Sequence, residues 1–177
     1  YPELGRAAWI WSASLSEHND TPFRVLLGHG EAKPSGRELV RWALGRSEHT
    51  LPALALAAIE PIPERFPGAS AKLLREGERV RDAWNELLGD DGVMLLPSYR
   101  RLAPRHRQPL LRPFDHGYTA IVNVTGLAST QVPLGLDPEG LPLGVQVVAA
   151  QGRDHLCVAV ARELERAFGG WVPPSLA

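Results

Sequence analysis

Hydrophobic residues recur at helical spacing in several stretches of this chain. The clearest stretch is Ser70–Leu88, where Leu73, Val80 and Trp84 fall near one face and charged residues lie mostly opposite them. Gly89 follows directly and is a natural helix end. The same spacing predicts four further helices, at Ser35–Gly45, Pro52–Glu60, Phe114–Val124 and Asp154–Phe168.

Short apolar runs bounded by glycine and proline predict strands between these helices. They are Val93–Leu96, Thr130–Leu134 and Leu143–Ala150, with a turn at Asp137–Gly140 joining the last two. Residues 97–113 are rich in proline and arginine and are expected to form a long surface loop. The interleaving predicts an α/β fold with a mixed sheet flanked by helices. We expect one segment over residues 1–177, with a helical and loop region at 1–68 and an α/β core at 69–177.

Composition narrows the class of protein. The net charge of −1 argues against binding to nucleic acid. Cys157 is the single cysteine, so no internal disulfide is possible, and a reducing, cytoplasmic location is expected. The six histidines are scattered without ligand spacing, so we expect no metal and no cofactor. The longest apolar run, Leu51–Ile59, is too short to span a bilayer. The chain begins with Tyr1 rather than methionine, which suggests part of a longer protein.

The most informative stretch is NVTGLASTQVPLGLDPEGLPLGVQ, at residues 123–146. Its glycines and prolines stand at the spacing found near the C-terminus of amidase-signature enzymes, and the chain resembles that family. Residues 86–113 and the ending AFGGWVPP are similar to the fatty-acid amide hydrolase branch, in particular to fatty-acid amide hydrolase 2-like enzymes. Ala128 stands where that family usually has proline, which alters only a local turn.

The resemblance implies the C-terminal portion of the amidase-signature fold and amide bond hydrolysis, with fatty-acid amides as candidate substrates. Such enzymes use a Ser–cis-Ser–Lys triad in a Gly/Ser-rich stretch that lies upstream of this segment. Neither Lys33 nor Lys72 stands in such a stretch. We therefore assign no catalytic residue here. The catalytic N-terminal part of the same enzyme is the expected partner, a small-molecule amide is the expected substrate, and the chain alone is expected to be inactive.

By resemblance, the helix that precedes this motif lines the acyl channel, so His116, Thr119, Ala120 and Asn123 are candidate substrate-binding residues. Within a helix, residues 116 and 120 share a face, so both could touch a lipid chain. The alternative is an ordinary core helix packed on the sheet.

Other interpretations remain beside this one. The chain could be a non-catalytic interaction or scaffold module derived from an amidase, or an independent lipid-binding domain. A hidden triad of Ser129 with Asp115–His116 or Asp154–His155 is disfavoured, because neighbouring helical residues diverge by about 100° and no nucleophile elbow surrounds the serine. The arginines of the 97–113 loop could bind an anion, although pairing with acidic neighbours is the plainer expectation. A sheet fragment should also leave an unpaired edge, which predicts self-association into a homo-oligomer.

Overall fold

The computed structural model describes residues 5–17, 21–30, 35–106, 108–112 and 115–173. The chain divides into two compact units, Ser12–Leu74 and a second unit made of Tyr1–Trp11 with Arg75–Ala177. Two helices cross the boundary between them, α1 (Ala7–Glu17) and α6 (Pro67–Leu88). Each unit is described separately below.

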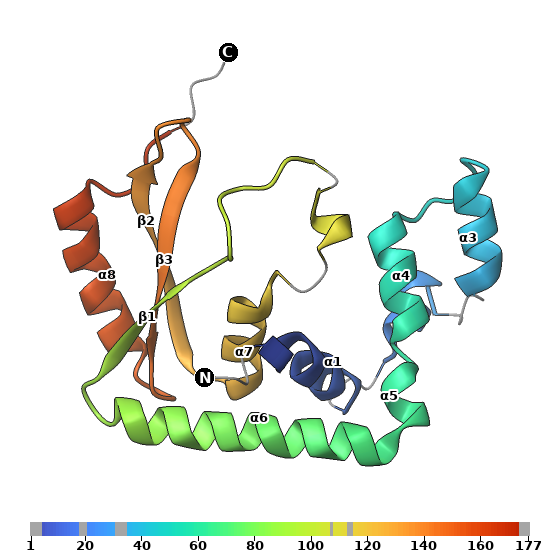
Figure 1. The fold of residues 1–177 in the computed structure, drawn as a ribbon, viewed down its shortest axis with the longest axis horizontal. Helices are drawn as coiled ribbons and strands as arrows, with labels where there is room; N and C mark the ends of the chain where they lie inside the picture. Colours follow the sequence, from blue (N-terminus) through green and yellow to red (C-terminus); the bar gives the residue numbers. More distant parts are fainter. Residues whose placement is uncertain (1–4, 18–20, 31–34, 107, 113–114, 174–177) are drawn as a thin grey trace. The chain divides into compact units, whose positions relative to one another are not determined.

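The larger unit contains a three-stranded sheet (Figure 1). Its strands are β1 (Val93–Pro97), β2 (Ala128–Leu136) and β3 (Pro142–Ala149), in the order β1-β3-β2. Both pairings are antiparallel, whereas the sequence predicted a mixed sheet; the α/β class with flanking helices is confirmed. A tight turn after β2 explains the antiparallel pairing of β2 with β3, because Asp137 accepts hydrogen bonds from the N–H groups of Glu139 and Leu141 at 2.9 and 2.7 Å.

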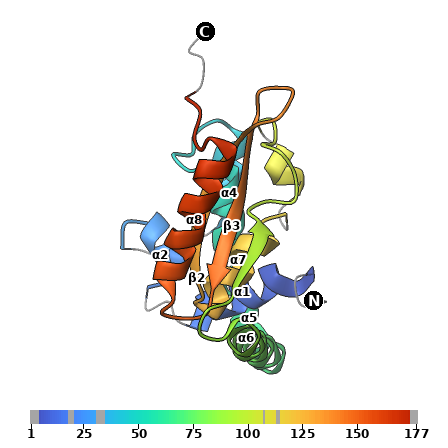
Figure 2. The same ribbon diagram turned by 90° about the vertical axis from the view of Figure 1, so that its left-hand side faces the viewer.

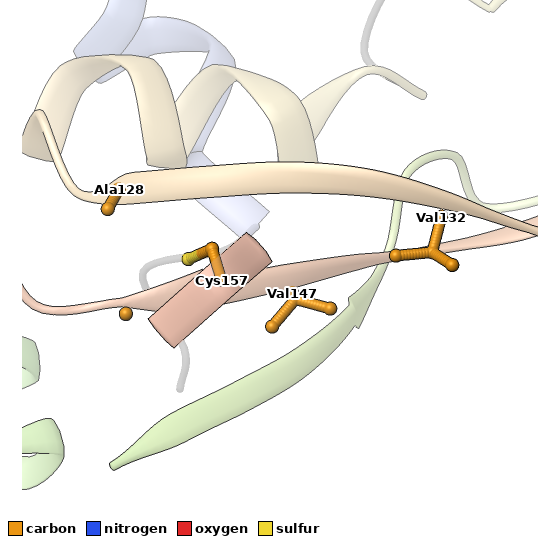
Figure 3. Close-up of a cluster of buried hydrophobic side chains, with 5 residues drawn as sticks. Ala128, Val132, Val147 and Cys157 are labelled. Atoms are coloured by element: carbon orange, nitrogen blue, oxygen red, sulfur yellow. The ribbon is translucent and has the colours of Figure 1, made fainter. Parts of the chain in front are cut away.

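One face of the sheet is covered by α8 (Asp154–Phe168), which packs on β2 and β3. Alternate residues of the strands point to this helix, so Ala128, Val132 and Val147 form a buried cluster with Cys157 (Figure 3). Val147 and Cys157 are fully buried. Burying this many aliphatic side chains is the main source of stability for the layer. Gly169 ends α8 in the left-handed conformation, as its position after the apolar pattern predicted.

A shorter helix, α7 (Gly117–Thr125), lies on the other side of the sheet from α8 in both views (Figures 1 and 2). It begins three residues later than the sequence predicted, because residues 115–116 form a turn. Phe114, the predicted first residue, lies outside the described part. Ile121 of α7, Ile10 of α1 and Trp84 of α6 are each almost completely buried.

The smaller unit is helical, with α2 (Phe23–Leu27), α3 (Ser35–Ala43), α4 (Leu51–Ile59) and α5 (Ile62–Arg65). α4 packs on α2 and α3, and Leu54 of α4 is buried. The carboxylate of Glu60 accepts the backbone N–H groups of Phe23 and Arg24, which satisfies donors at the start of α2. α1, α2 and α5 were not predicted, because α1 is only weakly amphipathic and α2 and α5 are five and four residues long.

Of the other predicted elements, α8 has the predicted ends, and the rest are present with ends shifted by one to three residues. The 97–113 loop is largely irregular but contains one short 3-10 helix, Gln108–Leu111. Among the described residues, no helix combines the length and apolarity needed to cross a membrane.

Candidate functional site

The helix α7 holds three of the four residues that the sequence singled out, with His116 directly before it, and its C-terminal end is firmly fixed. Gly126 adopts φ 61°, a left-handed conformation that ends the helix. The hydroxyl of Thr125 donates to the carbonyl of Ile121 at 2.9 Å, and the side-chain amide of Gln151 donates to the carbonyl of Thr125 at 3.1 Å. The segment after β3 is therefore tied to the end of α7.

The structure distributes those four residues over different environments. Ala120 is 2% exposed and lies in the core, whereas Asn123 is exposed and Thr119 is half-buried. Thr119 and Asn123 are one turn apart and share the more open side of α7. His116 precedes the helix, and its ring meets the Trp11 ring edge-on with centroids 5.7 Å apart. The structure thus groups Thr119 with Asn123 and separates them from Ala120.

A groove of about 680 Å³ opens on the larger unit, in the size range of about 300–1,000 Å³ that is common for ligand sites. The loop after β1 forms one wall, and parts of β2 and β3 form the rest. The lining is mostly apolar with a few polar side chains: Pro97, Ser98, Tyr99, Arg100, Arg101, Leu102, Ala103, Pro104, Gln131, Pro133, Pro142, Leu143 and Gly144. None of the four α7 candidates lines it. Sequence reasoning missed this groove, because its walls come from segments far apart in the chain.

Several polar side chains lie on the sheet face that bears this groove. Gln131 and Gln146 stand opposite each other on β2 and β3. The hydroxyl of Ser98 donates to the side-chain oxygen of Gln131. Gln146 is buried, and its amide donates to the Pro97 carbonyl while its oxygen accepts from Ser129, both at 3.4 Å. Two glutamine amides are therefore held in fixed orientations across the sheet.

Gly144 makes room for the Gln131 amide. A Cβ at position 144 would collide with the amide nitrogen of Gln131 and would lie 3.0 Å from the Val132 carbonyl oxygen. The sequence shows a glycine there, but no local pattern reveals that the glycine accommodates a side chain of the neighbouring strand.

Two arginines of the 98–112 loop share the buried carboxylate of Asp115. Asp115 pairs with Arg101 at 3.3 Å and with Arg100 at 3.8 Å, and both guanidinium groups remain more than half exposed. The expected pairing of loop arginines with an acidic neighbour is thus confirmed for these two. One carboxylate between two arginines leaves a net positive charge at the groove.

The disfavoured hydrolase triad finds no support in these contacts. Asp115 is engaged by arginines, His116 by Trp11, and Ser129 by Gln146. Lys72 is exposed on α6, as its place on the polar side of the predicted helix required, and Lys33 lies outside the described residues. Burial raises the pKa of the Cys157 thiol, which favours its protonated, unreactive form. Over the described ranges, no three His, Cys, Asp or Glu side chains gather as they would around a metal ion.

Comparison with known proteins shows the family to which the chain belongs. The model of the Amidase family matches residues 65–158, which is more than half of the chain. The chain is similar to a known structure of 6-aminohexanoate cyclic dimer hydrolase, with a TM-score of 0.53 and 24% identity over 94% of the chain and 41% of that protein. This structural similarity concerns the fold. The chain belongs to the amidase family.

Within that family, the chain is similar to fatty-acid amide hydrolases of type 2. It is 42% identical to fatty-acid amide hydrolase 2-B of Danio rerio, over 99% of the chain and 34% of that protein. It is 44% identical to fatty-acid amide hydrolase 2 of Homo sapiens, over 94% of the chain and 32% of that protein. The chain therefore spans about a third of the length of these relatives.

Proposed function

We propose that this chain is the C-terminal segment of an amide hydrolase that acts on fatty-acid amides. The observation that carries the proposal is the similarity to fatty-acid amide hydrolase 2 proteins along almost the whole chain. The contribution of the segment is structural: three strands of sheet closed on one face by α8, and a wall for the substrate's acyl chain on the other side.

The catalytic groups belong to the N-terminal part of the same enzyme in this proposal. The amidase mechanism needs a lysine that deprotonates a bridging serine, which in turn activates a nucleophilic serine. Lys72 is exposed on a helix, and Ser129 is hydrogen-bonded to an amide rather than to a base. Without a nucleophile of its own, the isolated segment should not hydrolyse amides.

The acyl-pocket wall is assigned to His116, Thr119, Ala120 and Asn123. The support is geometric: Thr119 and Asn123 share an accessible side of α7, while Ala120 lies behind them in the core. The hydroxyl of Thr119 donates to the His116 carbonyl at 2.9 Å, so this donor is satisfied without the substrate. Thr119 and Asn123 would then contact the substrate, and Ala120 would support them.

Partners and location complete the proposal. Besides the N-terminal catalytic part and the amide substrate, we include a homo-oligomer, because β1 and β2 each have a single strand partner among the described strands. A dimer of the isolated chain would be seen by light scattering at dilute concentration.

No nucleic-acid partner is included, in keeping with the balanced charge. A cytoplasmic location is included because the single cysteine is buried and unpaired.

Turnover and active-site labelling test the proposal together. The 177-residue chain and the full-length gene product are each incubated with oleamide and a p-nitroanilide, and each is treated with a serine-directed fluorophosphonate. We expect turnover and stoichiometric labelling in the full-length product alone. Labelling of the 177-residue chain that tracks its turnover would contradict the assignment of the catalytic groups to the N-terminal part. A full-length product that neither turns over amides nor labels would favour a scaffold module derived from an amidase.

A further inference from the structure

The groove beside the 98–104 loop combines an apolar lining with hydrogen-bond donors at one wall. Arg100 and Arg101 are exposed, at 60% and 56% of their side-chain surface, and share the single carboxylate of Asp115. The loop from Ser98 to Arg112 contains five arginines and no aspartate or glutamate. The charge at this wall is therefore positive, and it complements an anion.

A third donor comes from the floor of the groove. Because Ser98 donates to the oxygen of the Gln131 side chain, the amide nitrogen of Gln131 is turned toward Gly144. Gln131 and Gly144 both line the groove, and the glycine has no side chain to cover this amide nitrogen. Arg100 and Arg101 on the wall and Gln131 on the floor all line this groove.

Most of the remaining lining is aliphatic. Pro97, Pro133, Pro142, Leu102 and Leu143 line the groove. Leu102 and Leu143 are 41% and 37% exposed, so an apolar ligand would remove them from water. Such a surface fits a hydrocarbon chain better than a peptide, because β3 is the central strand and its backbone groups are already paired on both sides.

We propose that this groove binds a long-chain carboxylate, with its carboxyl group held by Arg100, Arg101 and the Gln131 amide and its hydrocarbon chain on the prolines and leucines. A carboxylate accepts from a guanidinium through two parallel hydrogen bonds, and an uncharged amide or alcohol head group cannot reproduce that interaction. The site is separate from the α7 residues assigned to the acyl pocket, and its occupation requires no hydrolysis.

Calorimetric titration of the full-length gene product with laurate below its micellar concentration tests the site. Dodecanol serves as the uncharged ligand of equal chain length. We expect laurate to bind at least about tenfold more tightly than dodecanol, because charge-assisted hydrogen bonds are the stronger class. Laurate binding that is absent, or no tighter than dodecanol binding, would overturn the proposal, and this includes the case in which another part of the gene product covers the groove.

Variants then locate the binding. Arg100→Gln removes one donor and leaves the Arg101–Asp115 pair in place, and Gln131→Leu removes the floor donor. We expect each variant to weaken laurate binding about five- to tenfold with dodecanol binding unchanged. Arg105→Gln is the matched control, since this exposed arginine of the same loop does not line the groove. If Arg100→Gln and Arg105→Gln weaken laurate binding equally, the binding depends on the overall charge of the loop, and the proposed site is overturned.

Discussion

The two faces of the sheet in the larger unit differ in what covers them and in what their side chains can do. On one face, Val132 and Val147 are sealed beneath α8 together with Cys157. On the other face, Gln131 and Ser129 are exposed and hydrogen-bonded, and Gln131 lines an accessible groove. Since residues alternate along each strand, the same strands supply both faces. The comparison teaches that the face under α8 is closely packed, whereas the other face combines the buried Val148 with exposed polar side chains at the groove.

The largest effect is expected on the sealed face. Val147→Asp places a charge in the core, at a fully buried position on the central strand. A buried, unpaired carboxylate has no compensating partner there, so we expect a loss of at least about 3 kcal/mol in the free energy of unfolding. Urea denaturation measures it. Gln131→Ala on the exposed face is the control, expected to change stability by less than about 0.5 kcal/mol. Similar losses for both variants would erase the distinction between the faces.

The second effect separates two positions on α7. Ala120→Trp overpacks a site that is 2% exposed and should cost about 1–3 kcal/mol of stability. Asn123→Trp adds the same ring at an exposed position and should leave the melting temperature nearly unchanged. Thermal denaturation of the two variants decides between them. An Ala120→Trp variant as stable as the unmodified chain would mean that Ala120 faces an empty space rather than the core.

A third effect concerns the fit between β2 and β3 on the groove face. Gly144→Ala introduces a methyl group against the Gln131 amide, so the amide must move, and we expect a loss of about 0.5–1 kcal/mol. Gln131→Ala should relieve much of that loss, because it removes the group that the methyl would meet. A double-mutant cycle on unfolding free energies measures this coupling. Strictly additive effects would show that the close approach to the Val132 carbonyl, and not Gln131, requires glycine.

The smallest effect is a pH dependence that arises from the sealed face. Burial raises the pKa of the Cys157 thiol above its ordinary value of 9.0, so the folded state favours the protonated form. The stability from this group is fully present below pH 9.0 and is lost as the pH rises through the folded-state pKa, because the unfolded thiol ionises first. Stability curves of the unmodified chain and Cys157→Ala from pH 7 to pH 10.5 should therefore converge at the alkaline end. A constant difference between the curves would contradict a buried thiol.

The sequence was informative where a pattern is local and repetitive. Helical spacing predicted α6 and α8 with nearly correct ends, and the glycine and proline spacing of residues 123–146 indicated the amidase family, which the comparisons confirm. α1 escaped prediction because its tryptophans and serines form no apolar stripe. The groove was not predicted for another reason. Ser98 and Gln131 are 33 residues apart in the sequence, and their contact depends on strand order and register. The periodicity of a single sequence does not determine either of these.

The central claim is that the side of the sheet away from α8 contacts the substrate, and acyl-chain selectivity tests it most directly. The quantity is the ratio of kcat/KM for a long and a short acyl amide, measured in the full-length gene product and in its Asn123→Trp variant. Discrimination in an apolar pocket is worth roughly 1–3 kcal/mol for each methylene gained or lost. We therefore predict that Asn123→Trp lowers this ratio at least about tenfold at an unchanged melting temperature. An unchanged ratio, with full activity on both amides, would contradict the account and remove Thr119 and Asn123 from the substrate pocket.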